Sequence, residues 1–152
     1  MSRPNWDEYF LKIALLTAER ATCHRHHAGA IAVKDRRIIS GGYNGAPIGH
    51  KDCLELGCLR QGIPSGELTE ICRAVHAEEN CVIQGGSALI GSTIYCTHPP
   101  CRRCAKMLCN AKIVRYVTCG KYADNAFRDL FEKAGIKFEV LPKPPLIITE
   151  LA

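Results

Sequence analysis

Two short segments of this chain hold side chains that could do chemistry. The first is "HAE", with His76 and Glu78, and the second is "PCRRC", with Cys101 and Cys104 separated by two residues. If a helix begins at the first cysteine, the second lies one turn later, and a helix N-terminus favours thiolate over thiol. One imidazole and two thiolates are three protein ligands, whereas a closed structural zinc has four. The pattern therefore predicts an open zinc site.

Glu78 is the predicted proton carrier of this site. Zinc can lower the pKa of a bound water to about 7, which supplies hydroxide at neutral pH. On a continuous helix Glu78 would point roughly 200° away from His76, but at the first turn it can flank the metal and act as general acid and base. We interpret the neighbouring Glu79 as a solvated or interface charge, and Asn80 as a brace for the helix start or a nearby loop.

Either segment alone is compatible with several roles. A lone H-x-E occurs by chance, and a lone C-x-x-C could be a redox pair or half of a zinc ribbon. Both segments lie at predicted helix starts and occur in the order H-x-E, then P-C-x-x-C. That combination favours a catalytic metal centre.

The elements that must position these residues alternate between helix and strand. Tyr9, Ile13, Leu16 and Arg20 lie about one turn apart and predict an amphipathic helix over residues 6–21. Two apolar runs around residues 34–36 predict a hairpin within residues 29–45. The later predicted elements are a helix over 76–84, a strand over 92–97, a helix over 100–111 opened by Pro100, a strand over 113–119, a helix from Asp124 to Ala134 closed by Gly135, and a strand over 136–141. This order predicts a three-layer α/β/α domain with a central mixed five-stranded sheet whose later strands are parallel.

Length and composition bound the class of protein. A chain of 152 residues with 47% hydrophobic and 23% charged residues is typical of a single globular domain, here residues 1–152. No apolar run is long enough for a membrane span, and the N-terminus lacks the features of a secretory signal. We therefore expect a cytoplasmic protein without a membrane partner. The net charge of +5 is compatible with a phosphate-bearing ligand but does not separate a nucleotide from a nucleic acid.

The ten cysteines fit metal binding better than disulfides in a reducing cytosol. Four of them lie in apolar helical or strand surroundings and are predicted core residues: Cys81, Cys96, Cys109 and Cys119. Residues 44–72 contain Gly, Pro and further cysteines without clear periodicity. A loop of this length in a compact domain is usually functional or held by other groups.

The chain resembles the cytidine and deoxycytidylate deaminase superfamily. H-x-E followed by P-C-x-x-C is the signature of zinc-dependent nucleobase deaminases, in which the Glu is not a ligand. The resemblance runs along nearly the whole chain and is strongest to deoxycytidylate (dCMP) deaminases, including bacterial late-competence-type members. The similar segments are "RPNWDEYFLKIALLTAERATCHR", "GGYNGAPIG", "CRAVHAEENCVIQ", "YCTHPPCRRCAKML" and "TCGKYAD". Of these, "GYNGAPIG" is informative because the zinc chemistry itself does not need it.

The resemblance implies a cytidine-deaminase-like fold and hydrolysis of dCMP to dUMP and ammonia, in pyrimidine deoxynucleotide metabolism and dTMP supply. His76, Cys101 and Cys104 would hold zinc, and Glu78 would pass protons to N3 and to the departing amine. Asn44 would hydrogen-bond the substrate, and the Ala77 backbone N–H would contact the pyrimidine carbonyl. Tyr122 and Arg25 match positions that touch substrate in some members, although either could have a structural role.

A second, structural zinc is a further expectation. Cys53, Cys58 and Cys72 bracket the 44–72 loop, and the segment "ATCHRHH" adds Cys23. Some family members have a second zinc, and the ligands predicted here are Cys23, Cys53 and Cys72, with Cys58 or a histidine from residues 24–27 as the fourth. Free thiols and solvated histidines are the alternative.

Other functions remain open from the residues. One alternative is a deaminase of another cytosine or adenine substrate, such as a tRNA adenosine, although no basic stripe for nucleic acid is visible. Another is a non-catalytic, zinc-stabilised module that binds DNA or protein. The resemblance further implies a homo-oligomer, with a hexamer favoured, and allosteric effects of dCTP and dTTP, the latter with Mg2+.

Overall fold

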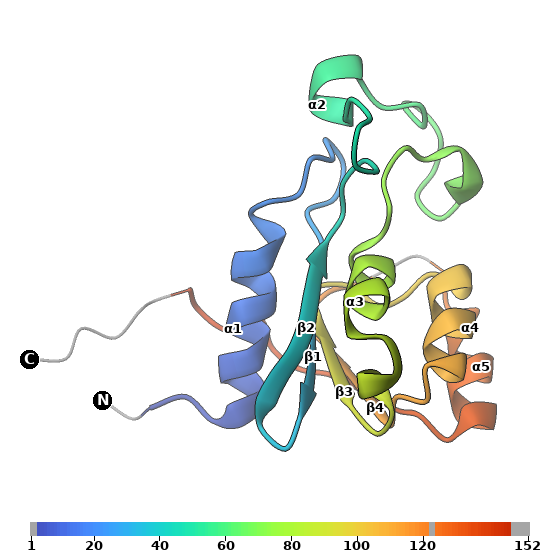
Figure 1. Cartoon of the computed structure of the whole chain (residues 1–152). Helices are drawn as coiled ribbons and strands as arrows, with labels where there is room; N and C mark the ends of the chain where they lie inside the picture. Colours follow the sequence, from blue (N-terminus) through green and yellow to red (C-terminus); the bar gives the residue numbers. More distant parts are fainter. Residues whose placement is uncertain (1–2, 122–123, 147–152) are drawn as a thin grey trace, which may run out of the picture.

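A mixed five-stranded sheet forms the centre of the molecule (Figure 1). The computed structural model describes residues 3–121 and 124–146. The strand order is β2-β1-β3-β4-β5, with β1 antiparallel to β2 and β3, and with β3, β4 and β5 parallel. The strands are β1 (Gly29–Lys34), β2 (Arg37–Tyr43), β3 (Thr93–Cys96), β4 (Arg115–Thr118) and β5 (Lys137–Val140). The predicted hairpin and parallel later strands are confirmed.

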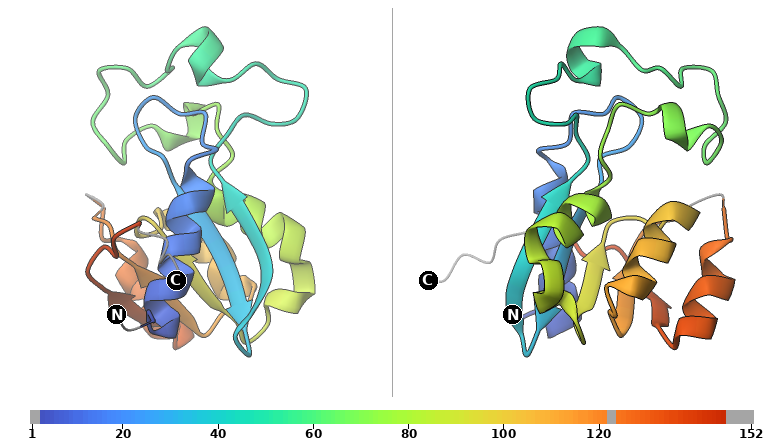
Figure 2. Two further views of the ribbon diagram at one scale, coloured as in Figure 1. Left: turned by 90° about the vertical axis from the view of Figure 1, so that its left-hand side faces the viewer. Right: turned by 45° about the vertical axis from the view of Figure 1, so that its right-hand side comes forward.

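Helices cover both faces of the sheet, which confirms the three-layer α/β/α architecture (Figures 1 and 2). Helix α1 (Trp6–Ala18) lies on one face. Helices α3 (Ala77–Gly85), α4 (Arg102–Asn110) and α5 (Phe127–Ala134) lie on the other. Three short helical turns complete the chain: α2 (Cys53–Leu56), η1 (Thr69–Ile71) and η2 (Gly86–Leu89). In the described part of the chain, no helix has the length and apolarity to cross a membrane.

The buried face of α1 differs from the predicted one. Phe10, Leu11 and Ala14 pack against strand residues, whereas Tyr9 and Leu16 are 43% and 58% exposed. The prediction counted one-turn spacing from Tyr9, but the apolar stripe that includes positions 10, 11, 14 and 18 is the one that covers the sheet. The helix also ends at Ala18, three residues earlier than predicted.

The ends of the later helices follow local capping chemistry. Cys101 is the N-cap of α4, so Pro100 lies before the cap and not in the first turn as predicted. Helix α5 begins at Phe127 because the Asp124 side chain accepts the Ala126 N–H at 2.8 Å and holds a turn before the helix. Gly135 ends α5 with φ +73°, as the sequence predicted.

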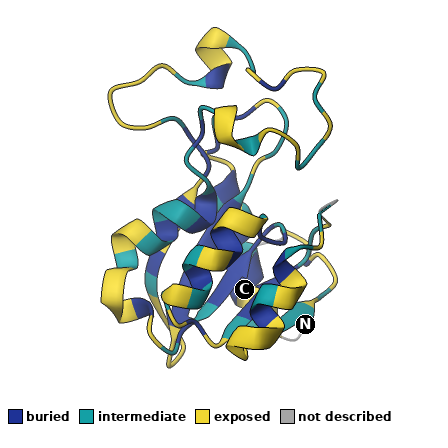
Figure 3. Ribbon diagram, turned by 90° about the vertical axis from the view of Figure 1, so that its right-hand side faces the viewer, coloured by how far each residue is buried: buried dark blue, intermediate teal, exposed yellow. Residues whose placement is uncertain are grey.

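Burial follows the layers (Figure 3). The outward faces of α3, α4 and α5 are exposed, while strands β1, β3 and β4 are largely buried. Cys81 and Cys96 are fully buried, and the partly buried Cys109 and Cys119 pack against the two hydrophobic clusters. The prediction that these four cysteines are core residues is confirmed.

The segments that matter for function meet at one end of the strands. Strand β1 begins at this end of the sheet, and β2 and β3 stop there, because Gly29 pairs with Tyr43 and Ala30 pairs with Cys96. The chain before β1, the chain after β2 and the chain after β3 therefore meet. The segment over residues 44–72 extends beyond the same end of the sheet, with α2 farthest from the strands (Figure 1).

Candidate active site

The three predicted metal ligands lie together at two facing helix starts. His76 is the N-cap of α3, Cys101 is the N-cap of α4, and Cys104 lies one turn into α4. His76 Nδ1 is 3.5 Å from Cys101 Sγ and 3.4 Å from Cys104 Sγ. The described residues contain this one group of three His, Cys, Asp or Glu donors within 4.8 Å of one another.

The spacing of these donors fits zinc. With Zn–S near 2.3 Å, Zn–N near 2.0–2.1 Å and tetrahedral angles, a ligand nitrogen and sulfur should lie about 3.6 Å apart. The observed separations of 3.5 and 3.4 Å agree with this value. The Cys104 hydrogen bond is the largest cause that lowers the pKa of Cys101, to about 4, whereas the pKa of Cys104 is raised. One imidazole and two thiols at this spacing are donors that suit a metal cation.

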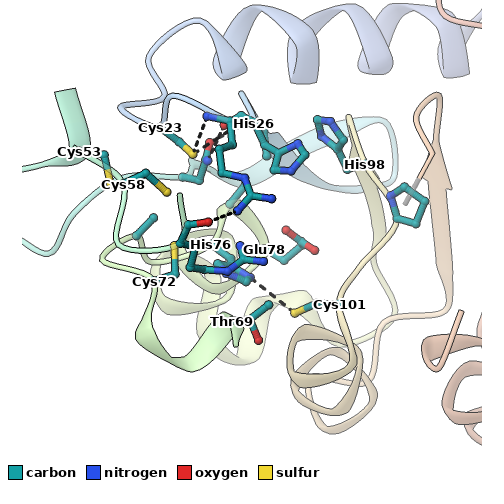
Figure 4. A pocket seen from close by; sticks show the side chains of 17 residues that line it. Cys23, His26, Cys53, Cys58, Thr69, Cys72, His76, Glu78, His98 and Cys101 are labelled. Atoms are coloured by element: carbon teal, nitrogen blue, oxygen red, sulfur yellow. Dashed lines mark hydrogen bonds between the residues drawn. The ribbon is translucent and has the colours of Figure 1, made fainter. Parts of the chain in front are cut away.

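Glu78 is buried beside this group. Its exposed fraction is 6%, and burial is the largest cause that raises its pKa to about 7. His76 has extended backbone angles (φ −70°, ψ 157°), so the helical rotation expected between His76 and Glu78 does not apply. Both side chains line one pocket, as Figure 4 shows. A carboxyl group whose pKa is near 7 can both accept and donate a proton beside a metal site.

Tyr116 is a neighbour of Glu78 that the sequence reasoning missed. Its Oη donates to the His98 carbonyl at 2.6 Å and lies 3.5 Å from Glu78 Oε2. Tyr116 is fully buried in β4 and touches the α3 helix start across the layers. The sequence predicted the strand that holds Tyr116, but not that its hydroxyl reaches the site.

Glu79, predicted as a solvated or interface charge, is not simply solvated. Its Oε1 accepts the His76 backbone N–H at 3.1 Å and a hydrogen bond from Arg103 Nη2 at 2.7 Å. One carboxylate therefore joins the first turns of α3 and α4, the two helices that present the predicted metal ligands. The prediction for Asn80 is confirmed, since its Nδ2 donates to the Tyr43 carbonyl at the end of β2.

The site forms part of a pocket built from several parts of the chain. The lining residues come from the segment before β1, from the chain just after β2, from the 53–72 loop, from the start of α3, and from the segment between β3 and α4. In Figure 4 Cys53 and Cys58 lie on one side, while Glu78, Cys101 and His98 lie on the other. The pocket thus extends from the metal ligands toward the loop.

Three of the predicted substrate contacts line this pocket: Asn44, Ala77 and Arg25. The Asn44 side chain accepts the Ala28 N–H and donates to the His26 carbonyl, each at 2.8 Å, so it also shapes the segment before β1. Ala77 is the first residue of α3, where a backbone N–H has no partner within the helix. Tyr122 lies outside the described residues.

Sequence reasoning missed two further pocket residues, His98 and Arg60, and considered His26 only among the histidines that could complete a second zinc site. The two histidine rings meet edge to face at 5.8 Å, and burial is the largest cause that lowers the pKa of each. The two rings become neighbours only because the chain before β1 and the chain after β3 lie at the same end of the sheet.

The four cysteines predicted for a second metal also line the pocket, but not as one compact group. Cys23, Cys53, Cys58 and Cys72 are all lining residues, while their sulfurs do not meet the 4.8 Å spacing of the first group. Cys23 Sγ accepts the backbone N–H groups of Arg25 and His26. His24 Nε2 lies 2.7 Å from the Cys53 carbonyl, so this nitrogen braces the loop.

The fold and the site define a class: an α/β deaminase with a His/Cys/Cys metal site and an adjacent Glu. Residues 4–120 match the family described as the cytidine and deoxycytidylate deaminase zinc-binding region, and the chain belongs to this family.

Individual proteins similar to this chain give a more specific comparison than the family does. Deoxycytidylate deaminase of Mycobacterium phage D29 is 42% identical over 123 residues, covering 77% of this chain and 96% of that protein. ComE operon protein 2 of Bacillus subtilis (strain 168) is 35% identical over 153 residues, covering 97% and 77%. The dCMP deaminase of cyanophage S-TIM5, solved in complex with dCMP and dUMP, is 28% identical with a TM-score of 0.73, covering 93% of this chain and 100% of that one.

Proposed function

We propose that this chain is a zinc-dependent dCMP deaminase that hydrolyses dCMP to dUMP and ammonia. The observation that supports it most directly is the His76, Cys101 and Cys104 donor group with the buried Glu78 beside it. The relatives named deoxycytidylate deaminase, and the similar phage enzyme that binds dCMP and dUMP, support the choice of substrate.

Each residue has a distinct role in this reaction. A zinc ion, when bound by the three ligands, supplies a nucleophile from water at neutral pH. Glu78 accepts one proton of the attacking water and delivers it to N3 of the pyrimidine. It then takes the proton of the new C4 hydroxyl and passes it to the departing amine, which leaves as ammonia while the C4 carbonyl forms. A pKa of about 7 suits a group that must first accept and then donate.

Other groups of the pocket orient the base. The N–H of Ala77, at the N-terminus of α3, is a donor for the pyrimidine carbonyl. Asn44 has one amide hydrogen left after its two bonds to the 26–28 segment, and this hydrogen can bind the nucleotide. Arg25 and Tyr122 are the phosphate or base contacts expected from the resemblance.

The test is ammonia release from purified protein with dCMP, dCTP, cytidine and tRNA as substrates. Glu78→Gln should keep zinc and lower the rate with dCMP by about 10²–10⁴-fold, because the carboxamide cannot carry the proton. A variant that deaminates dCMP at the normal rate would refute the role of Glu78. Activity on tRNA without activity on dCMP would instead favour the polynucleotide deaminase, and no release from any substrate would favour the non-catalytic binding module.

A structural zinc bound by Cys23, Cys53, Cys58 and Cys72 is a second part of the proposal. Its support is that the four cysteines line one pocket and that Cys23 Sγ accepts two backbone N–H groups. Elemental analysis should give two zinc ions per chain, and one in Cys53→Ser. One zinc per chain in both proteins would exclude the second site.

Several expectations stay predictions for this chain. They are the homo-oligomer with a hexamer favoured, the effects of dCTP and of dTTP with Mg2+, the cytoplasmic location and the extent of the single domain over residues 1–152. Light scattering, and the ammonia assay with and without the two triphosphates, test the first two.

A further inference from the structure

Arg60 is a buried cation in the loop above the site. It lies between α2 and η1, is 7% exposed and lines the same pocket as Arg25. Its Nε donates to the Glu67 carbonyl at 2.9 Å, and its Nη2 donates to the Pro64 carbonyl at 3.3 Å. The loop thus holds the Arg60 guanidinium in one orientation.

Arg25 and Arg60 are held as a pair. Arg25 Nη1 donates to the Arg60 carbonyl at 2.7 Å, which links the segment before β1 to the 53–72 loop. Both charges act on His26 in the same pocket, where they add to burial in lowering its pKa. Two cations from different segments therefore line the same pocket, and both act on His26.

The pair has no carboxylate partner in the described part of the chain. No carboxylate oxygen there lies within 4.0 Å of either guanidinium, although an arginine is rarely this buried without an anionic partner. Backbone carbonyls satisfy hydrogen bonds of Arg60 but carry no net charge. Glu78 is the one carboxylate among the lining residues, and it belongs to the metal end of the pocket. The arrangement is therefore incomplete without an anion.

We propose that Arg60, together with Arg25, binds the 5′-phosphate of the substrate and makes the pocket select a nucleoside monophosphate over the nucleoside. This inference rests on the proposed dCMP deaminase function and adds Arg60 to it. A phosphate monoester carries about −1.5 to −2 charge at pH 7, which two guanidinium groups neutralise. Arginine also binds phosphate through two parallel N–H groups. Arg60 Nη1, which has no hydrogen bond within the described residues, supplies one such donor.

A competing role for Arg60 is to balance thiolate charge in the loop and nothing more. Arg60 is one of the groups that lower the pKa of Cys72. Arg73 offers a matched control, because its charge acts on Cys53, whose pKa burial raises, as that of Arg60 acts on Cys72, but it lines a different pocket. Its Nε also donates to a loop carbonyl, that of Gly57 at 3.5 Å. The two arginines therefore share these features and differ in access to the substrate pocket.

The experiment compares wild type, Arg60→Gln, Arg60→Lys and Arg73→Gln, each loaded with zinc, using dCMP and deoxycytidine. Arg60→Gln should lose about 10–100-fold in kcat/KM for dCMP, mainly through KM, because one charge-assisted phosphate contact is removed. Its activity on deoxycytidine should change little. Arg60→Lys should recover part of the loss, and Arg73→Gln should behave as wild type. Inorganic phosphate should inhibit deoxycytidine turnover by wild type and much less by Arg60→Gln.

Equal losses for dCMP and deoxycytidine in Arg60→Gln with unchanged zinc content would overturn the proposal, since Arg60 would then only hold the loop. Equal effects of Arg73→Gln would overturn it as well. If Arg60→Gln does not fold, wild type and Arg60→Lys decide the question. A wild type that prefers dCMP over deoxycytidine, together with a partial loss of kcat/KM for dCMP in Arg60→Lys, supports the proposal. A wild type that uses both substrates equally well overturns it. Wild type that releases ammonia from neither substrate refutes the proposed function itself.

Discussion

Gly42 should be the glycine on which the geometry of the site depends. It lies in β2 directly beneath the first turn of α3. A Cβ added there would lie 2.6 Å from the Ala77 carbonyl oxygen and 2.7 Å from the Cys81 backbone nitrogen. Both are backbone atoms of α3, so no side chain can move aside. Gly42→Ala must therefore push the helix away from the strand.

The size of the effect follows from these contacts. Ordinary contact begins at 3.4 Å, so the α3 backbone must move by about 0.8 Å at Ala77. His76 and Glu78 are the two neighbours of Ala77 and would move with it. A shift near 1 Å can cost about 10²-fold in rate, or about 2.7 kcal/mol in the barrier. Overpacking of this kind also destabilises a fold by about 1–3 kcal/mol.

Ammonia release with dCMP, zinc content and thermal unfolding measure the two consequences. Gly41→Ala is the matched control, because a Cβ at the neighbouring position meets the Ala30 carbonyl oxygen and Ile31 Cγ2 at an ordinary 3.4 Å. We expect Gly42→Ala to lose activity and stability while Gly41→Ala keeps both. If the two variants were equally active and equally stable, the close approach of β2 and α3 would not position the site.

Two further predictions concern ion pairs. Arg103→Ala should release zinc faster to a chelator, because it removes the bond to Glu79 that joins both ligand helices, while costing under about 1 kcal/mol in stability since Arg103 is 54% exposed. Arg102→Ala, on the same exposed turn, is the control, and equal zinc loss in both would contradict the role of Glu79. Asp7→Asn should lower the unfolding free energy by about 1 kcal/mol at pH 7. The Arg115 hydrogen bond lowers the pKa of Asp7 below 3.8, so this difference should shrink as the pH falls below about 4, and a difference that grew in acid denaturation would refute it.

The elements were predictable where the local pattern was strong. The hairpin, the parallel later strands and the end of α5 at Gly135 follow from apolar runs and turn residues, which act within a few positions. The residues from which the amphipathic pattern of α1 was read are not the ones that face the sheet. Tyr9 and Leu16 fit a helical spacing as well as Phe10 and Ala14 do. Only the sheet that the helix covers distinguishes the two stripes.

The sequence by itself determined the chemical groups of the site. The spacing of Cys101 and Cys104 at a helix start, and of His76 and Glu78 at another, is local and fixes which side chains can face one ion. The tertiary structure alone decided what surrounds them. Glu79 is hydrogen-bonded to Arg103, 24 positions away, and Arg25 to the Arg60 carbonyl, 35 positions away. These contacts form because the strand order brings separate segments to the same end of the sheet. Such contacts depend on how the layers pack, and no spacing within one segment encodes them.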